Sequence, residues 1–407
     1  MTKAKTNQLT EHFFRHNYAK ISAILASYFG LSEVEIAEDI VQDTLVEAME
    51  KWSIQSIPDN PEGWLMDVAK KKMINYLKRN QNFKTKIAPN LATPLSHSDA
   101  TLEKDSTLKM IFTCCHPILP SESQIALALK SLCGLSVGEI SNALLTTEST
   151  VNKRLYRAKQ KFRDGSIRFE FPQEEYITER LDNVFTTLYL LFNEGYYSSH
   201  SKKLIRMDLC FEAIRLVKDV IGHFPNSSKA KALLSLMLLS VARFESRTDQ
   251  NGAIIILAEQ DRTLWNKNLI TQGIDYLHKS SKGKEISSYH LQAGIAAEHC
   301  LAKDFHSTKW TSIYKQYSLL EKIKSTPIVL LNKAISKFYG INKEEALADL
   351  LAIKTNQDLQ KNLHYFTALG IFHIELNQGE KAISYFETAL QLSHSLQEQS
   401  FIKSLMR

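Results

Sequence analysis

The sequence predicts an all-α protein. Apolar residues recur every three or four positions in most segments, and the alternation expected of strands is almost absent. Only 14 glycines and 9 prolines interrupt the 407 residues. A chain of this length is sufficient for two or three domains.

Two amphipathic helices are predicted at the start of the chain. The first spans 9–29, and Gly30 is expected to end it. Ser32 and Glu35 have the spacing of a capping box, which predicts a second helix to about Trp52. Residues 33–50 contain seven acids and no Lys or Arg. We expect this helix to face a protein partner, because DNA phosphates would repel it; the alternative is an ordinary solvated face.

A basic helix follows, predicted to start with Asn60 as its N-cap and Pro61 as its first residue. Residues 67–86 contain seven Lys or Arg against Asp67, interleaved with aromatic residues. That combination is typical of surfaces that bind single-stranded nucleic acid, where rings stack on bases. The alternative is a structural role in the core for Trp64, Val68 and Met73.

Residues 81–105 are predicted to be a linker, because they contain Pro89 and Pro94 and little apolar periodicity. Residues 106–165 are then predicted to form a compact four-helix domain. Ser121 and Gln124 are spaced as a capping box for one of its helices.

The last part of this domain, residues 136–163, is predicted to be a helix-turn-helix. Ser136 and Glu139 form a capping box for a short first helix, and Thr147 can cap the second. Residues 148–163 contain six Lys or Arg and one acid. A short helix, a tight turn and a basic helix predict a reader of the DNA major groove. The alternative is a solvated basic helix on a helical bundle.

Residues 166–407 are predicted to be helical and repeat-like. The positions of a 34-residue helical repeat are occupied most clearly by Phe366, Leu369, Gly370, Ala382, Phe386 and Ala389. Stacked helix pairs of this kind form a concave surface that suits a peptide or protein partner. The alternative is a helical bundle without a groove. Asn193, Glu194 and Gly195 interrupt an apolar helix, so we expect them to cap its end or to form a buried hydrogen-bonded turn.

Catalytic and metal sites are not predicted. Cys114, Cys115 and His116 lack a second Cys/His pair at zinc-site spacing. Glu194 and the Asp261–Arg262 pair are not accompanied by a nucleophile constellation or a Gly-rich phosphate loop. We therefore expect no enzyme, no cofactor and no metal.

The same composition favours the cytoplasm. No apolar run is long enough to cross a bilayer, and the N-terminal residues lack the apolar core of a signal peptide. Five cysteines are typical of buried thiols in a reducing compartment.

In this order, the segments resemble a bacterial sigma factor of the extracytoplasmic-function type. Residues 37–52 are similar to the polymerase-binding helix of region 2, and 60–79 to the helix that melts and reads the −10 element. Residues 108–159 are similar to region 4, which reads the −35 element. The helix at 60–79 departs from the family pattern at Asp67 and Asn75.

The resemblance implies three sets of binding residues. Core RNA polymerase would contact Asp39, Gln42 and Asp43. The −10 DNA would contact Trp64, Lys71, Lys72, Asn75, Lys78 and Arg79. The −35 DNA would contact Ser149, Thr150, Lys153, Arg154 and Arg157.

The rest of the chain resembles the group of these factors with a C-terminal tetratricopeptide-like extension. Its signatures are similar to residues 188–199, 258–266, 291–300 and 330–335. The resemblance implies a regulatory extension, with candidate residues Asn193, Glu194, Gly195, Tyr196, Asp261 and Arg262. The implied domains are 1–80 (region 2), 81–105 (linker), 106–165 (region 4) and 166–407 (extension).

The function implied is promoter recognition with core RNA polymerase, regulated in cis by the extension. Two alternatives remain from the residues alone. One is a helix-turn-helix repressor or activator with a repeat-type sensor domain. The other is a helical-repeat scaffold on which the basic helix is incidental.

Overall fold

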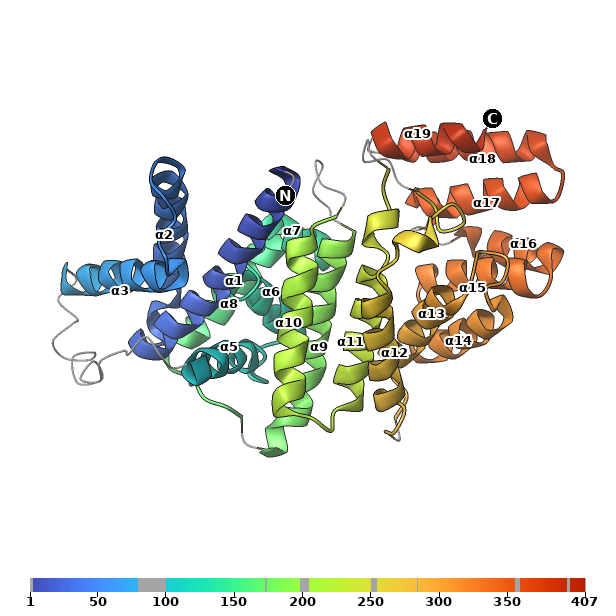
Figure 1. The fold of residues 1–407 in the computed structure, drawn as a ribbon. Coiled ribbons are helices and arrows are strands. Elements are labelled where there is room, and N and C mark those ends of the chain that lie inside the picture. The colour runs from blue at the N-terminus through green and yellow to red at the C-terminus, as the bar shows by residue number, and fades with distance from the viewer. Residues whose placement is uncertain are drawn as a thin grey trace. The chain divides into compact units, whose positions relative to one another are not determined.

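The computed structural model of the chain divides into two compact units, Met1–His223 and Phe224–Arg407 (Figure 1). It describes residues 3–79, 100–172, 174–197, 205–249, 255–283, 285–355, 359–393 and 396–406. Every regular element within these ranges is a helix. The predicted all-α class is therefore confirmed.

The first unit begins with a three-helix group. Its elements are α1 (Lys3–Phe29), the 3₁₀ turn η1 (Leu31–Glu33), α2 (Val34–Ile54) and α3 (Pro61–Arg79). These helices share one apolar core that includes Leu25, Val41, Leu65 and Met73. Gly30 has a positive φ of 93°, so the chain turns there between α1 and η1. The Asn60 side chain accepts the Gly63 N–H at 3.0 Å, which confirms the predicted cap.

A second group of helices in this unit contains the helix-turn-helix. Its members are α5 (Ala100–Cys114), α6 (Ser121–Ser131), α7 (Val137–Ala143) and α8 (Glu148–Arg163). The predicted linker lies mostly outside the described residues, but α5 begins at Ala100, inside the range 81–105. The Ser136–Glu139 capping box and the Thr147 cap are both present.

Two other predicted capping boxes are wrong. No side-chain bond caps α2: η1 occupies the expected start, and Glu35 instead contacts Lys159 and Arg163 of α8. At α6, Pro120 holds the N-cap position, and the Gln124 side chain donates to the carbonyl of Leu119 at 2.8 Å. In both cases another partner binds the side chain that the capping box requires. Gln124 binds a nearby backbone carbonyl, and Glu35 binds two cations far along the chain.

The helical hairpin formed by α9 (Glu174–Tyr196) and α10 (Met207–His223) completes the first unit. Helix α9 contacts α5, α6 and α7, and α10 contacts α1 and α5. The apolar face of α9 is buried, including Val184, Phe185, Leu188 and Leu191. The compact unit therefore extends to His223, which differs from the boundary predicted at residue 166.

The second unit is a series of helix pairs. Its helices are α11 (Ser228–Val241), α12 (Lys267–Ser280), α13 (Ser288–Leu301), α14 (Trp310–Ile323), α15 (Pro327–Gly340), α16 (Lys343–Ala352), α17 (Leu363–Glu375), α18 (Gly379–Leu392) and α19 (Leu396–Leu405). Short 3₁₀ turns join some of them: η3 (Phe244–Ser246), η4 (Arg262–Leu264), η5 (Ile353–Thr355) and η6 (Leu359–Lys361). Sequential helices contact one another, most extensively α11 with α12 and α17 with α18.

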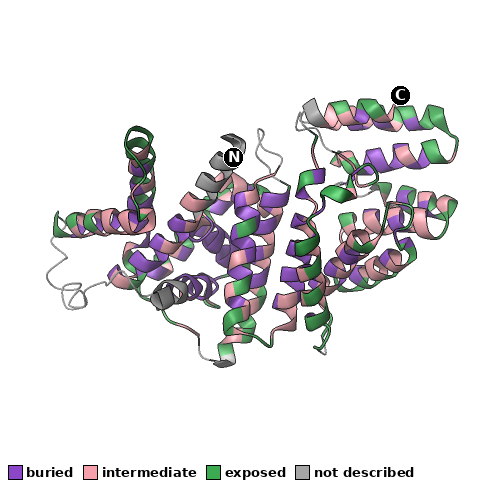
Figure 2. Ribbon diagram, viewed as in Figure 1, coloured by how far each residue is buried: buried purple, intermediate pink, exposed green. Residues whose placement is uncertain are grey.

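The repeat-like packing of α17 and α18 depends on a small residue. A Cβ atom at Gly370 would collide with the Phe386 ring, so only glycine allows this close approach. Phe338 of α15 stacks on Phe372 of α17 at 3.7 Å between ring centroids, which joins successive pairs. Figure 2 colours each residue of the ribbon by its burial. Phe366 and Phe386 are themselves buried in the core. They therefore do not line a concave groove.

Candidate nucleic-acid and polymerase interface

Helix α8 presents one buried and one solvated face. Val151, Leu155, Ala158 and Phe162 are buried, as their spacing predicts. Of the residues predicted for the −35 element, Ser149, Lys153 and Arg157 are exposed, whereas Thr150 and Arg154 are half-buried. Thr150 is also held in the cap, since its N–H donates to the Thr147 hydroxyl at 3.2 Å. Four of the five residues lie in the N-terminal half of the helix, and Arg157 lies just past its middle.

The six cations of α8 fall into two groups. Lys153, Arg154 and Arg157 form no ion pair with any described residue. The three nearer the C-terminus, by contrast, are paired: Lys159 with Glu38, Lys161 with Asp164 and Arg163 with Glu35. Uncompensated charge is what attracts phosphates, so the part of α8 up to Arg157 is suited to DNA. A count of charges in the sequence does not separate the two groups.

Helix α2 places its predicted polymerase contacts in solvent. Asp39, Gln42 and Asp43 are exposed, and the opposite face is buried in the three-helix core. Val46 and Met49 are 54% and 59% exposed on the same helix, two apolar residues that sequence reasoning missed. Exposed apolar side chains beside charged ones are typical of a protein-binding surface. The sequence could have indicated these two residues, because their positions fall outside the helical stripe of buried apolar residues.

Helix α3 divides the residues predicted for the −10 element. Lys71, Asn75, Lys78 and Arg79 are exposed at helical spacing on one face. Trp64 and Lys72 are instead half-buried: the Trp64 ring lies 5.4 Å from that of Trp52, and Lys72 lies 2.8 Å from Glu47. The structure therefore groups four of the six residues and commits the other two to contacts within the three-helix group.

The Asn193–Tyr196 stretch lies at the end of a helix, which is one of the two structural roles expected for it. It forms the last turn of α9, which runs to Tyr196. The carbonyl of Gly195 accepts the backbone N–H of Arg206 at 2.7 Å. A Cβ atom at Gly195 would lie 2.7 Å from Cys210 Sγ, so glycine is needed where α9 meets the start of α10. The stretch thus closes the helical hairpin α9–α10.

This junction connects the hairpin to the helix-turn-helix through Arg206. The Arg206 guanidinium bonds the carboxylate of Glu139, the capping-box residue of α7, and lies 3.9 Å from buried Glu194. Burial alone would raise the pKa of Glu139, but hydrogen bonds from Ser136 and the charge of Arg206 lower it. Sequence reasoning missed Arg206, because no local pattern marks a contact between segments so far apart in the chain.

Asp261 and Arg262 belong to the second unit, and Asn193–Tyr196 belong to the first. The Asp261 carboxylate accepts the N–H of Thr263 at 2.8 Å and caps η4. Arg262 donates to the carbonyls of His299 and Ala302 at 2.6 and 2.8 Å, at the end of α13. Both residues stabilise the packing of η4 against α13.

Within the described ranges, no group of three His, Cys, Asp or Glu side chains is placed so that it could hold a metal ion. Burial raises the pKa of the Cys115 thiol to about 12. Among the described helices, none is long and apolar enough to cross a membrane.

Comparisons with known proteins match three segments. Residues 13–83 match the family Sigma-70 region 2, and residues 109–162 match Sigma-70, region 4. Residues 180–281 match a family of unknown function, DUF6596. A curated relative from Rhizobium meliloti (strain 1021), named as an uncharacterized protein, is 32% identical over 388 residues, covering 93% of this chain and 90% of the relative. No solved structure matches.

Proposed function

Because the chain belongs to the sigma factors of the extracytoplasmic-function type that carry a C-terminal helical extension, we propose that this extension regulates promoter recognition in cis. As a sigma factor the protein serves transcription initiation, and its two sigma-70 regions bind core RNA polymerase and promoter DNA. The protein is not an enzyme.

We assign the binding faces as follows. Asp39, Gln42 and Asp43 of α2 contact core polymerase, because they are exposed on an acidic helix that DNA would repel. Lys71, Asn75, Lys78 and Arg79 of α3 contact the −10 DNA, and the N-terminal half of α8 enters the major groove at the −35 element.

The observation that carries the cis regulation is the position of the helical hairpin α9–α10. Its helix α10 contacts α1, which lies in the segment that matches region 2. Its helix α9 contacts α6 and α7, which lie in the segment that matches region 4. The first two helices of the extension therefore contact both DNA-binding regions at once.

Polar side chains fix both contacts. On the region 2 side, the His16 ring lies 3.5 Å from the carboxylate of Glu212, a fully buried residue that also bonds Arg215 at 2.6 Å. On the region 4 side, Asn183 of α9 donates to Gln124 of α6 at 2.8 Å. Buried charged and polar groups with defined partners favour one docking geometry over others.

This compact arrangement is too small for a promoter. The two elements are named for positions about 25 base pairs apart, which is roughly 85 Å of B-DNA at 3.4 Å per base pair. A compact unit of 223 residues has a radius of gyration of about 17 Å and a width on the order of 45 Å. Regions 2 and 4 must therefore separate to read both elements, and every contact that holds them together opposes that step.

The test is a full-length Arg206→Met variant, which removes the contact of the hairpin with Glu139. We expect transcription from the cognate promoter to change by at least about threefold, the effect of a contact worth roughly 0.7 kcal/mol. Lys218→Met is the matched control, since Lys218 is an exposed cation on α10. If Arg206→Met transcribes like both the control and the wild-type protein, the hairpin does not regulate the factor.

A further inference from the structure

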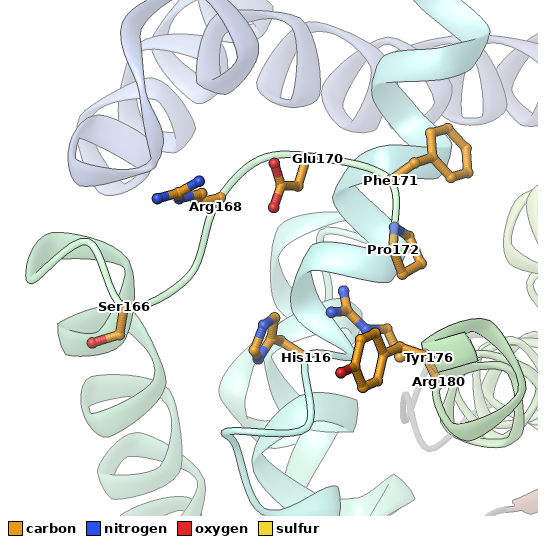
Figure 3. Close-up of a pocket in the computed structure, with 8 residues that line it drawn as sticks. All are labelled: His116, Ser166, Arg168, Glu170, Phe171, Pro172, Tyr176 and Arg180. Atoms are coloured by element: carbon orange, nitrogen blue, oxygen red, sulfur yellow. The ribbon is translucent and has the colours of Figure 1, made fainter. Parts of the chain in front are cut away.

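A cleft lies beside the segment that joins α8 to α9 in the first unit (Figure 3). Its volume is about 450 Å³, within the range of small-molecule sites. One wall is the connecting segment itself, and the floor is formed by the end of α5 and the start of α9. The lining residues are His116, Ser166, Arg168, Glu170, Phe171, Pro172, Tyr176 and Arg180.

Arg180 is a buried cation without a counter-ion among the described residues. It is 8% exposed, and its Nη1 donates to the carbonyl of Phe112 at 3.1 Å, near the end of α5. Its Nε has no hydrogen-bond partner, and no described carboxylate lies within ion-pair distance of the guanidinium. Burial lowers the pKa of Arg180, because a charge removed from water is destabilised. An anion in the cleft would compensate that charge.

Two more side chains supply donors to the same cleft. Arg168, on the connecting segment, is exposed to solvent. The Ile118 N–H donates to His116 Nδ1 at 3.2 Å, so a neutral His116 ring carries its proton on Nε2. Burial and the nearby Arg180 lower the pKa of His116, which keeps the ring neutral and a donor at pH 7.

The charges favour a small anion. Two arginines and one acid, Glu170, line the cleft, so its net charge is +1 with neutral His116. Pro172 and Tyr176 add apolar surface that an inorganic ion alone would not use, whereas the Phe171 ring packs against Phe112 and His223. Promoter DNA does not fit, because a phosphate on a rigid duplex cannot reach Arg180, a residue that is only 8% exposed.

We propose that this cleft binds a small organic molecule through a phosphate or carboxylate group, with Arg168 and Arg180 as the anion-binding residues. The segment that lines it leads from the recognition helix α8 to the hairpin α9–α10. A ligand there would bias the docking of the hairpin, a consequence that rests on the proposed cis regulation. The binding itself does not depend on that regulation.

The experiment is calorimetric titration of the full-length protein at low salt, without polymerase or DNA. The probes are inorganic phosphate, phenyl phosphate and benzoate. We expect saturable binding of phenyl phosphate or benzoate that is tighter than that of inorganic phosphate, and the comparison of the two aromatic probes identifies the preferred anion. No saturable binding of any probe up to about 10 mM, a free energy weaker than roughly −3 kcal/mol, would overturn the proposal.

Variants on the rim of the cleft decide whether a measured signal comes from it. Arg168→Gln should weaken binding about fivefold or more, as the loss of a charge-assisted hydrogen bond does. Glu170→Gln should tighten binding about twofold or more, because it removes the one acid that repels the anion. Lys361→Gln, which removes an exposed cation in the second unit, should change it less than about twofold.

These side chains are exposed, so the variants do not disturb the core, unlike a change at Arg180. Equal weakening by Arg168→Gln and Lys361→Gln would mean general attraction to a basic protein and would overturn the site. Weaker binding by Glu170→Gln would exclude an anion as the ligand.

Discussion

Lys159 of α8 places its Nζ 2.8 Å from the carboxylate of Glu38 of α2, which joins the recognition helix to the acidic helix. Glu38 is only 4% exposed and also accepts a hydrogen bond of 2.5 Å from Ser131 of α6. A buried carboxylate is tolerated where its partners compensate it. Because those partners come from region 4, Glu38 keeps them only while regions 2 and 4 are in contact.

Lys159→Met should therefore open the first unit. The variant leaves the Glu38 carboxylate without a cation, so the compact arrangement loses on the order of 1–3 kcal/mol. We expect a longer distance between spectroscopic labels at Lys71 and Asn152, two exposed positions on α3 and α8. Transcription at limiting polymerase should rise severalfold, since separation of the regions is required to span the promoter.

Lys161→Met is the matched control, because among the described residues Lys161 pairs only with Asp164, three residues further along the chain. If the label distance and transcription of Lys159→Met equal those of this control, the contact with Glu38 does not hold the two regions together.

Arg154→Ala should weaken promoter binding and spare polymerase binding. Arg154 lies in the half of α8 whose cations form no ion pair with described residues. A side chain that reads a base edge contributes about 1–3 kcal/mol of discrimination, which is about fivefold to more than a hundredfold in affinity. Binding of the holoenzyme to cognate and scrambled promoters measures this, with Lys161→Ala as the control. Unchanged affinity for the cognate promoter would move the reading face elsewhere.

Asp39→Ala combined with Gln42→Ala should weaken association with core polymerase about tenfold. Both side chains are exposed on α2, so the double variant leaves the three-helix core intact. A titration of labelled core enzyme measures the affinity, and circular dichroism checks the fold. Glu344→Ala, an exposed acid in the second unit, is the control for a change in net charge. Undiminished affinity of the double variant would place the polymerase contact outside this part of α2.

Local features of the fold were predictable from the sequence, and contacts between distant segments were not. Ser136 and Glu139 form the predicted capping box, because both partners lie within one turn. Ser32 and Glu35 have the same spacing and form none, because Lys159 and Arg163 of α8 bind Glu35 instead. A pattern of four residues contains no information about a competing cation so far along the chain.

The same limit applies to the site. The helical spacing of Val151, Leu155, Ala158 and Phe162 places them on one stripe of α8, which is buried, and leaves Lys153 and Arg157 on the exposed face. It did not predict that Lys159 and Arg163 form ion pairs with acids of region 2, nor that Arg206 forms one with Glu139. These contacts exist because the hairpin and both regions pack as one unit, a property of the tertiary structure.

Acid should release the hairpin from region 2. Burial alone would raise the pKa of Glu212, but the neighbouring His16 and Arg215 side chains lower it from 4.5 to about 2. Because the pKa of Glu212 is lower in the folded state than in the unfolded state, its ionised carboxylate stabilises the fold above pH 4.5. This stabilisation is lost as the pH falls from 4.5 to 2. The shift corresponds to about 3 kcal/mol.

Glu212→Gln should remove this part of the acid sensitivity. The difference in stability between wild-type and variant should be largest at neutral pH and should shrink by pH 3, as measured by hydrogen exchange of the α10 amides. Glu179→Gln, a change at an exposed acid of α9, should show no such pH dependence relative to wild type. A constant difference across this range would mean that the Glu212 charge does not hold α10 in place.

Deletion of residues 224–407 should change transcription from the cognate promoter by at least about tenfold. This boundary follows the structure: it keeps the hairpin α9–α10, whereas a cut before α9 would strip the cover from the apolar surface of α5 and α6. A short connection gives a tethered unit a high effective concentration, so weak docking is well populated. Holding the factor ninety-nine per cent closed requires only about 2.7 kcal/mol, and its release could raise the active fraction up to about a hundredfold.

Run-off transcription at equal concentrations of folded protein measures the effect. An increase means that the second unit restrains the factor, and a decrease means that it assists the active arrangement. Equal activity of the truncated and full-length proteins would contradict a regulatory role for the second unit and confine cis regulation to the hairpin, where the Arg206→Met variant tests it separately.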